Sequence, residues 1–206
     1  MPMTPRVYLI DDEPGVRSMI ATLMEGVGIP LAAYPSADDF VRNFDPDARG
    51  CVIVDLCMEG MNGRDLQRWL IDNDVRLPVI FITGNGNVET AVDALKDGAL
   101  DFIQKPIDTR RLVDIVRSAL IAESQDHELQ LQAASIDERL AELTPGEREV
   151  LDGLVVGRNY KDLAEDLDVS YKTIEARRAR VLKKMRAKSI SELMRIMLTR
   201  LAATPA

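Results

Sequence analysis

The sequence predicts two domains of different fold class, a doubly wound α/β domain followed by an all-α domain. In roughly the first 120 residues, short apolar runs alternate with amphipathic stretches of helical period, a pattern typical of parallel sheets covered by helices. After residue 143, four helical patterns follow one another without a strand between them. The front of the chain is acidic and part of the back is strongly basic, so we expect the two domains to bind different partners.

Five apolar runs in the first domain are the predicted strands, and the amphipathic stretches between them are the predicted helices. The strand runs lie at 7–10, 31–34, 51–54, 79–82 and 101–103. The helical patterns lie at 16–27, 36–44, 64–74, 88–97 and 108–120. Because the strand runs are apolar at consecutive positions, both faces of each strand must be covered, which indicates a parallel sheet between two layers of helices.

Polar groups stand where the predicted strands end. Asp11 and Asp12 follow the first strand, Asp55 the third, Thr83 the fourth and Lys105 the fifth. Parallel strands present their carboxyl ends at one edge of the sheet, where ligands of doubly wound domains bind. We therefore expect three carboxylates, a hydroxyl and an ammonium group to meet at this edge.

Crowded carboxylates repel one another unless a cation neutralises them, and a set of oxygen ligands suits Mg²⁺. A hydroxyl at Thr83 and an ammonium at Lys105 could bind the oxygens of a phosphoryl group and spread its charge. Asp55 would then act as the nucleophile and accept the phosphoryl group as an acyl phosphate.

These residues and their spacing resemble the receiver domains of two-component signalling, which have flavodoxin-like (βα)5 topology. The resemblance covers about residues 5–122, and the stretches 79–84 and 98–106 are especially similar to the FixJ-type subgroup. It implies that Asp55 is the phosphoacceptor and that the Lys105–Pro106 peptide bond is cis. The metal ligands it implies are Asp11, Asp12, Asp55 and the backbone carbonyl of Cys57. The phosphate-binding and switch residues it implies are Thr83, Lys105 and the aromatic Phe102.

Two departures from the family pattern bear on this assignment. Glu59 stands where the family often has proline, and Asn85 and Asn87 stand in a loop that often reads Gly-His-Gly-Asp. Glu59 adds negative charge to an acidic loop, so it could change metal affinity or the rate of dephosphorylation. All five chemical positions are kept, and we retain the prediction of an active receiver.

The connector is acidic and lacks helix breakers. Residues 1–120 carry a net charge of −7, residues 121–140 one of −4 and residues 141–206 one of +3. No glycine or proline occurs between the fifth helical pattern and Pro145, so that helix can continue into the linker. The domain boundaries we expect are 1–122 for the first domain, 123–142 for a helical linker and 143–206 for the second domain.

Helix-start signals divide the second domain. Thr144, Pro145 and Glu147 form the pattern of a capping box with proline at the first helical position. A second helix follows, and Ser170 is the predicted N-cap of a third helix that begins at Tyr171. Two short helices joined by a tight turn, the second of them basic, describe a helix-turn-helix whose second helix enters the major groove of DNA.

This part of the chain resembles the LuxR/NarL-type DNA-binding domain, a four-helix module, in the stretches 143–150, 162–164, 169–175 and 184–185. By helical period, the residues predicted to face the bases are Glu175, Ala176, Arg177, Ala179 and Arg180. Those predicted to contact phosphates are Lys161, Ser170, Lys172, Thr173, Lys183 and Lys184. The family commonly has histidine where Arg177 stands, a departure that could change base preference.

Together these features predict a response regulator that acts as a transcription factor. We expect a sensor histidine kinase to phosphorylate Asp55 with Mg²⁺ present, and phosphorylation to promote homodimerisation and binding to double-stranded DNA. RNA polymerase is a further candidate partner. The chain has no membrane-length apolar run, no signal-peptide pattern and only two cysteines, so we expect a cytoplasmic protein without a membrane partner.

Two other functions compete with this prediction. A receiver fold regulated by partner binding instead of phosphorylation would still bind DNA, but a phosphoryl analogue would not change its oligomeric state. An aspartate-based phosphatase would need a second aspartate two positions after the nucleophile, where this chain has Cys57. We therefore expect no enzyme activity beyond the receiver's own phosphorylation and dephosphorylation.

Overall fold

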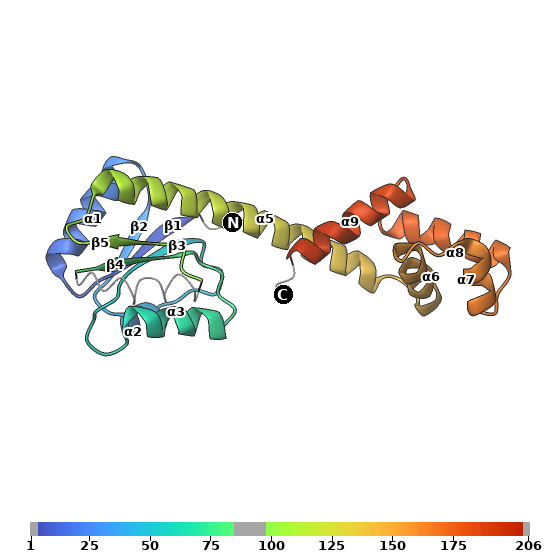
Figure 1. Ribbon diagram of the computed structural model, residues 1–206, viewed down its shortest axis with the longest axis horizontal. Helices are drawn as coiled ribbons and strands as arrows, with labels where there is room; N and C mark the ends of the chain where they lie inside the picture. The colour runs from blue at the N-terminus through green and yellow to red at the C-terminus, as the bar shows by residue number, and fades with distance from the viewer. Residues whose placement is uncertain (1–3, 85–97, 204–206) are drawn as a thin grey trace. The chain divides into compact units, whose positions relative to one another are not determined.

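The computed structural model describes residues 4–84 and 98–203, and the chain divides into two compact units after Gln125. Each unit is described by itself, with the elements labelled as in Figure 1. Among the described residues, no helix is both long and apolar enough to cross a membrane.

The first unit is a five-stranded parallel sheet of order β2-β1-β3-β4-β5, so the predicted α/β class and all five strands are confirmed. The strands are β1 (Arg6–Ile10), β2 (Leu31–Tyr34), β3 (Gly50–Asp55), β4 (Val79–Thr83) and β5 (Asp101–Gln104). The helices are α1 (Pro14–Gly26), α2 (Ala37–Arg42), α3 (Gly63–Asp72) and α5, which begins at Thr109. The helix predicted at 88–97 lies outside the described residues.

Alternate residues of each strand enter two separate cores, one on each face of the sheet. Val52, Val54 and Phe81 pack with the α2 and α3 side, while Ile53 and Ile80 pack with α1 and α5. Figure 1 shows these two pairs of helices on opposite sides of the sheet. All six residues of β3 are buried, as expected for a central strand covered on both faces.

A largely buried ion pair joins α5 to the amino end of β3. Arg49 donates from Nε and Nη2 to the two carboxylate oxygens of Glu123, at 2.9 and 3.1 Å. The two side chains are 17% and 7% exposed. Burial, together with the charge of Glu123, raises the pKa of the Cys51 thiol to about 12, so this thiol stays protonated at neutral pH.

The second unit is all-α, as predicted. Helix α5 (Thr109–Ala141) continues through the segment expected to be a linker, and its Ile136 and Leu140 join the core of this unit. The remaining helices are α6 (Pro145–Val155), α7 (Tyr160–Asp166), α8 (Tyr171–Lys184) and α9 (Ile190–Ala203). Thr144 and Glu147 form the predicted capping box, and Ser170 caps α8 as predicted.

Candidate functional site

The strand ends bring the predicted polar residues of the first unit to one edge of the sheet. Asp11 directly follows β1, Asp55 ends β3, Thr83 ends β4 and Lys105 directly follows β5. Asp11, Asp55 and Thr83 are only 0%, 4% and 3% exposed. The parallel register places Ile10 beside Val54 and Asp55 beside Ile82, so the chain ends that carry these side chains are adjacent.

The three aspartates form one group of potential ligands. One carboxylate oxygen from each of Asp11, Asp12 and Asp55 lies within 4.8 Å of the others. Backbone amides fix two of the carboxylates, because Glu13 donates its N–H to Asp11 Oδ1 and Cys57 donates its N–H to Asp55 Oδ1, both at 2.8 Å. The other oxygen of each carboxylate, Oδ2, accepts from the Lys105 ammonium.

Lys105 contacts two of these aspartates and Glu13. Its Nζ lies 2.6 Å from Asp55 Oδ2, 3.2 Å from Asp11 Oδ2 and 2.7 Å from Glu13 Oε1. Burial alone would lower the pKa of Lys105, but hydrogen bonds to Asp55 and Glu13 and the charges of Asp11 and Asp55 raise its pKa above the ordinary value. Lys105 is therefore a cation at neutral pH, and the Lys105–Pro106 peptide bond is cis, as the resemblance implied.

Asp11 differs from an ordinary surface carboxylate. Burial raises its pKa, although the hydrogen bond from the Glu13 N–H and the charge and hydrogen bond of Lys105 act in the opposite direction. The site therefore holds a carboxylate that burial disfavours as an anion, which is the situation that a bound cation relieves.

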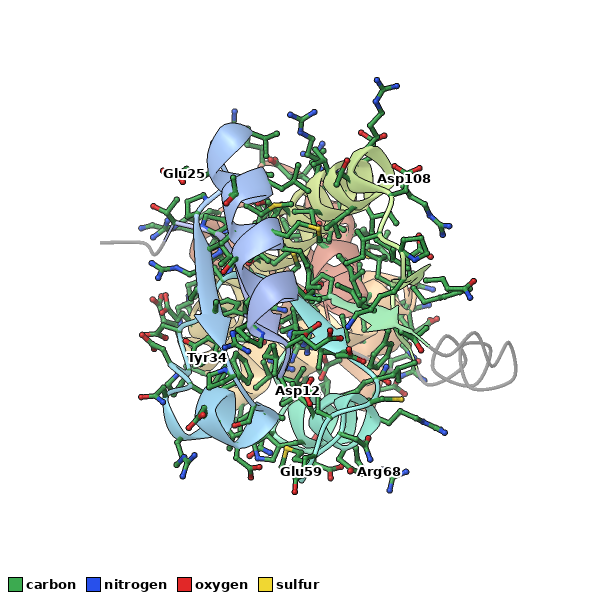
Figure 2. All side chains as sticks on the ribbon, turned by 90° about the vertical axis from the view of Figure 1, so that its left-hand side faces the viewer. Asp12, Glu25, Tyr34, Glu59, Arg68 and Asp108 are labelled. Atoms are coloured by element: carbon green, nitrogen blue, oxygen red, sulfur yellow. The ribbon has the colours of Figure 1, made fainter. Side chains whose placement is uncertain are left out.

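Phe102 and Cys57, two further predicted residues of the receiver, differ in burial. Phe102 is partly buried and packs against the core on the α2 and α3 side of the sheet. Cys57 is exposed, and its backbone N–H donates to Asp55 Oδ1. In Figure 2, Asp12 lies near the start of α1, whereas Glu59 lies at the lower edge of this face.

Glu13 also belongs to the site, because its carboxylate contacts Lys105, but it was not predicted from the sequence. Its place directly after Asp11 and Asp12 is the one sequence feature that indicates such a role.

The candidate nucleic-acid interface is the exposed side of α8. Glu175, Ala176, Ala179 and Arg180, four of the five predicted base-facing residues, are exposed. The fifth, Arg177, instead lies against the first turn of α6. Its Nη1 is 3.5 Å from the carbonyl oxygen of Gly146 and 3.8 Å from Glu149 Oε2. A β-carbon at Gly146 would lie only 2.7 Å from the Arg177 guanidinium carbon, so the glycine makes room for this side chain.

The residues predicted to contact phosphates also separate into two groups. Lys161, Lys172 and Lys183 are exposed, and Ser170 is exposed while its hydroxyl caps α8 by accepting the Thr173 N–H at 3.1 Å. Thr173 is partly exposed, and its hydroxyl oxygen lies 2.8 Å from that of Ser170.

Lys184, by contrast, has partners within its own unit. Its Nζ lies 2.6 Å from Glu147 Oε2 and 2.9 Å from the carbonyl oxygen of Glu142. Glu147 is buried, and its hydrogen bond with Lys184 and the one from the Thr144 N–H lower its pKa. This pair ties the capping box of α6 to the end of α8, a role that helical period alone did not indicate.

The lowered pKa of Glu147 predicts a pH-dependent stability of the second unit. A carboxylate with a lowered pKa in the folded state stabilises the fold above its ordinary pKa of 4.5, and this contribution is lost as pH falls through the lowered pKa. We expect Lys184→Met to lower the melting temperature at pH 7, with a smaller difference from the wild type at pH 3. Circular dichroism melts at both pH values measure this. An equal difference at both pH values would contradict the ionic origin of the effect.

The first domain has an α/β fold with three aspartates and a lysine at the carboxyl ends of its strands, and a helix-turn-helix domain follows it. This combination is typical of response regulators in two-component signalling. Residues 7–117 match the response regulator receiver domain, and residues 141–197 match the bacterial regulatory proteins of the luxR family. The chain therefore belongs to the response regulators.

Relatives along nearly the whole chain agree with this assignment. The transcriptional regulatory protein FixJ of Rhizobium meliloti is 39% identical over 196 residues, covering 93% of this chain and 94% of its own. FixJ of Azorhizobium caulinodans is 37% identical over 198 residues, covering 96% and 94%. Among solved structures, full-length FixJ from B. japonicum is 33% identical with a TM-score of 0.60, covering 97% and 98%. The response regulator StyR is 26% identical with a TM-score of 0.82, covering 95% and 99%.

The protein is therefore a response regulator with a receiver domain and a LuxR-type DNA-binding domain, similar to the FixJ regulators of transcription. The two FixJ relatives named above are described as transcriptional regulatory proteins. Phosphorylation-dependent control is the standard behaviour of this family.

Proposed function

We propose that Asp55 is the residue that a sensor histidine kinase phosphorylates, and that this modification controls DNA binding by the second domain. The position of Asp55 is the observation that carries the proposal. Its carboxylate is buried, its Oδ1 accepts the Cys57 N–H and its Oδ2 faces the Lys105 ammonium. A carboxylate held at a fixed place beside a cation suits nucleophilic attack on a phosphoryl group.

Mg²⁺ fits the ligands present. Three carboxylate oxygens that lie within 4.8 Å of one another are hard ligands of the kind this ion prefers, and they carry more negative charge than Lys105 neutralises. In this proposal Asp11, Asp12, Asp55 and the Cys57 carbonyl hold the ion. When bound, Mg²⁺ would neutralise charge on the phosphoryl oxygens. Lys105 and the Thr83 hydroxyl would bind the remaining oxygens, and the same groups would serve the receiver's own dephosphorylation.

The modification would act through dimerisation. In the proposed sequence, Thr83 moves toward the phosphoryl group and Phe102 follows into the space it leaves. The face formed by β5 and the receiver part of α5 then pairs with the same face of a second copy. A dimer binds two half-sites on DNA, and joining two weak contacts raises the effective affinity.

On DNA, α8 would lie in the major groove. The exposed Glu175, Ala176, Ala179 and Arg180 are the side chains proposed to face base edges, and the exposed lysines 161, 172 and 183 those proposed to contact phosphates. Arg177 would join the bases only after leaving Gly146. Chromosomal DNA as the target places the protein in the cytoplasm, where RNA polymerase is a further proposed partner.

Molar mass measured by light scattering on a sizing column tests this function. With beryllofluoride, a phosphoryl analogue, and Mg²⁺, we expect the wild type to shift from monomer to dimer and Asp55→Ala to remain monomeric. Asp72→Ala, which removes an exposed aspartate at the end of α3, is expected to behave as the wild type. No mass change in the wild type would contradict phosphorylation-driven pairing and favour a receiver regulated by a protein partner.

A further inference from the structure

The Lys105 ammonium has three N–H donors, and three carboxylates occupy them. Asp55, Glu13 and Asp11 lie at 2.6, 2.7 and 3.2 Å from Nζ. A phosphoryl group on Asp55 brings additional acceptor oxygens to this place. Because an acyl phosphate on Asp55 Oδ2 uses the oxygen that now accepts from Lys105, that donor is freed for one phosphoryl oxygen. Lys105 can donate to a second phosphoryl oxygen only when it gives up Asp11 or Glu13.

The three partners differ in how easily water can replace Lys105. The side chains of Asp11 and Asp55 are 0% and 5% exposed, whereas that of Glu13 is 61% exposed. A buried carboxylate that loses its cation stays in a poorly solvated place, but an exposed one is rehydrated. Glu13 is therefore the partner that Lys105 loses at the smallest cost.

The main chain at Glu13 allows this release without rearrangement. Its N–H is bound to Asp11 Oδ1, and Pro14 begins α1 directly after it, so the backbone is held in place. Glu13 is the N-cap residue of α1, yet its side chain makes no capping hydrogen bond and reaches Lys105 instead. Once released, the carboxylate stays near the amino end of a helix, where negative charge is favoured.

We propose that Glu13 is a positioning residue that competes with the phosphoryl group for Lys105. In the unphosphorylated receiver it holds the ammonium by a direct contact. The loss of this contact is part of the free-energy cost of phosphorylation, so Glu13 sets how readily the site accepts a phosphoryl group. The inference rests on the proposed function of Asp55 and adds a residue outside the metal and phosphate ligands.

The test is the affinity for beryllofluoride at saturating Mg²⁺, measured by isothermal titration calorimetry. An exposed ion pair of this kind contributes about 0.2–1 kcal/mol, so Glu13→Gln is expected to tighten binding by about 1.4- to 5-fold. Glu13→Asp keeps the charge but is one methylene too short for the contact, and it is expected to tighten binding as well. This variant therefore separates the effect of losing the contact with Lys105 from the effect of losing a negative charge.

Two matched controls remove one glutamate charge elsewhere. Glu25 lies at the other end of α1 from Asp12, as Figure 2 shows, and Glu59 is an exposed residue of the loop after β3. Glu25→Gln is expected to leave the affinity unchanged, and Glu59→Gln, which removes a charge from the loop after β3, is expected to change it less than Glu13→Gln does. If Glu59→Gln tightens binding as much as Glu13→Gln, the effect is one of net charge and the proposal fails.

Other outcomes are equally decisive. Weaker binding in Glu13→Gln would mean that Glu13 serves the metal or the fold and does not compete for Lys105, and unchanged binding would also overturn the proposal. A wild type that binds beryllofluoride through Asp55, with no gain in Glu13→Gln, refutes only the role of Glu13. A wild type without Asp55-dependent binding refutes the proposed function and this inference with it.

Discussion

Replacing Gly50 by alanine is expected to unfold the receiver domain or to lower its free energy of unfolding by more than about 4 kcal/mol. Gly50 begins β3 and has a φ of 129°, a conformation that side chains with a β-carbon rarely adopt. An alanine β-carbon there would lie 1.8 Å from the carbonyl oxygen of Arg6 and 2.6 Å from its nitrogen. Both atoms belong to the backbone of the paired strand β1, so the clash is relieved only by separating two central strands.

Trp69 makes this experiment specific to one domain. It is the single tryptophan of the chain and lies in α3, beside Phe44 with ring centroids 5.4 Å apart. Its fluorescence in a urea titration therefore follows unfolding of the receiver. Gly26→Ala, at a helical glycine where a β-carbon meets nothing within 4 Å, is the control and should change stability by at most about 1 kcal/mol. A midpoint for Gly50→Ala equal to that of the wild type would contradict the described backbone.

Arg180→Ala is expected to weaken specific DNA binding about 5- to 150-fold, because a bidentate arginine–guanine contact contributes about 1–3 kcal/mol of discrimination. Arg180 is exposed on α8, on the same side as Ala176 and Ala179, whose small side chains allow the helix to approach the base edges. The loss should be confined to operator DNA, since non-specific affinity comes mainly from phosphate contacts.

Two other substitutions in α8 serve as comparisons for Arg180. Arg177→Ala is expected to leave base preference nearly unchanged, because that side chain lies against Gly146 and Glu149. Lys183→Ala should weaken binding to all DNA sequences alike. It should also reduce the slope of log affinity against log salt concentration by about one, the value for one lost phosphate contact. Fluorescence anisotropy with operator and scrambled duplexes at several salt concentrations distinguishes these cases. Equal losses on both duplexes for Arg180→Ala would assign Arg180 to a phosphate instead of a base.

The fold and the chemical groups of the receiver site could be predicted from the sequence because they depend on strand ends. Consecutive apolar residues indicated strands buried on both faces, and that arrangement alone placed Asp11, Asp55, Thr83 and Lys105 at one edge. The capping box of Thr144 and Glu147 was equally predictable, since it depends on two residues only three positions apart.

Contacts of long side chains could not be predicted in this way. Helical period sorts residues onto faces, but Arg177 lies at the border of the apolar face, and its packing on α6 depends on the glycine at 146. Helical period likewise assigned Lys184 to a phosphate contact. In the structure Lys184 lies at the end of α8, and its ammonium donates to the Glu147 carboxylate. Glu13 reaches Lys105 across 92 residues of sequence, a distance over which periodicity carries no information.

The ion pair between Arg49 and Glu123 bears on where the receiver can be separated from the rest of the chain. The receiver match ends at residue 117, about 1.7 turns of α5 before Glu123. A fragment cut at residue 117 would keep Arg49 in its largely buried place without the carboxylate that neutralises it, and an unpaired buried charge is strongly destabilising. A fragment that ends at Gln125 keeps both partners. We therefore expect the fragment that ends at Gln125 to be the more stable of the two, because the carboxylate that neutralises Arg49 lies beyond the end of the receiver match.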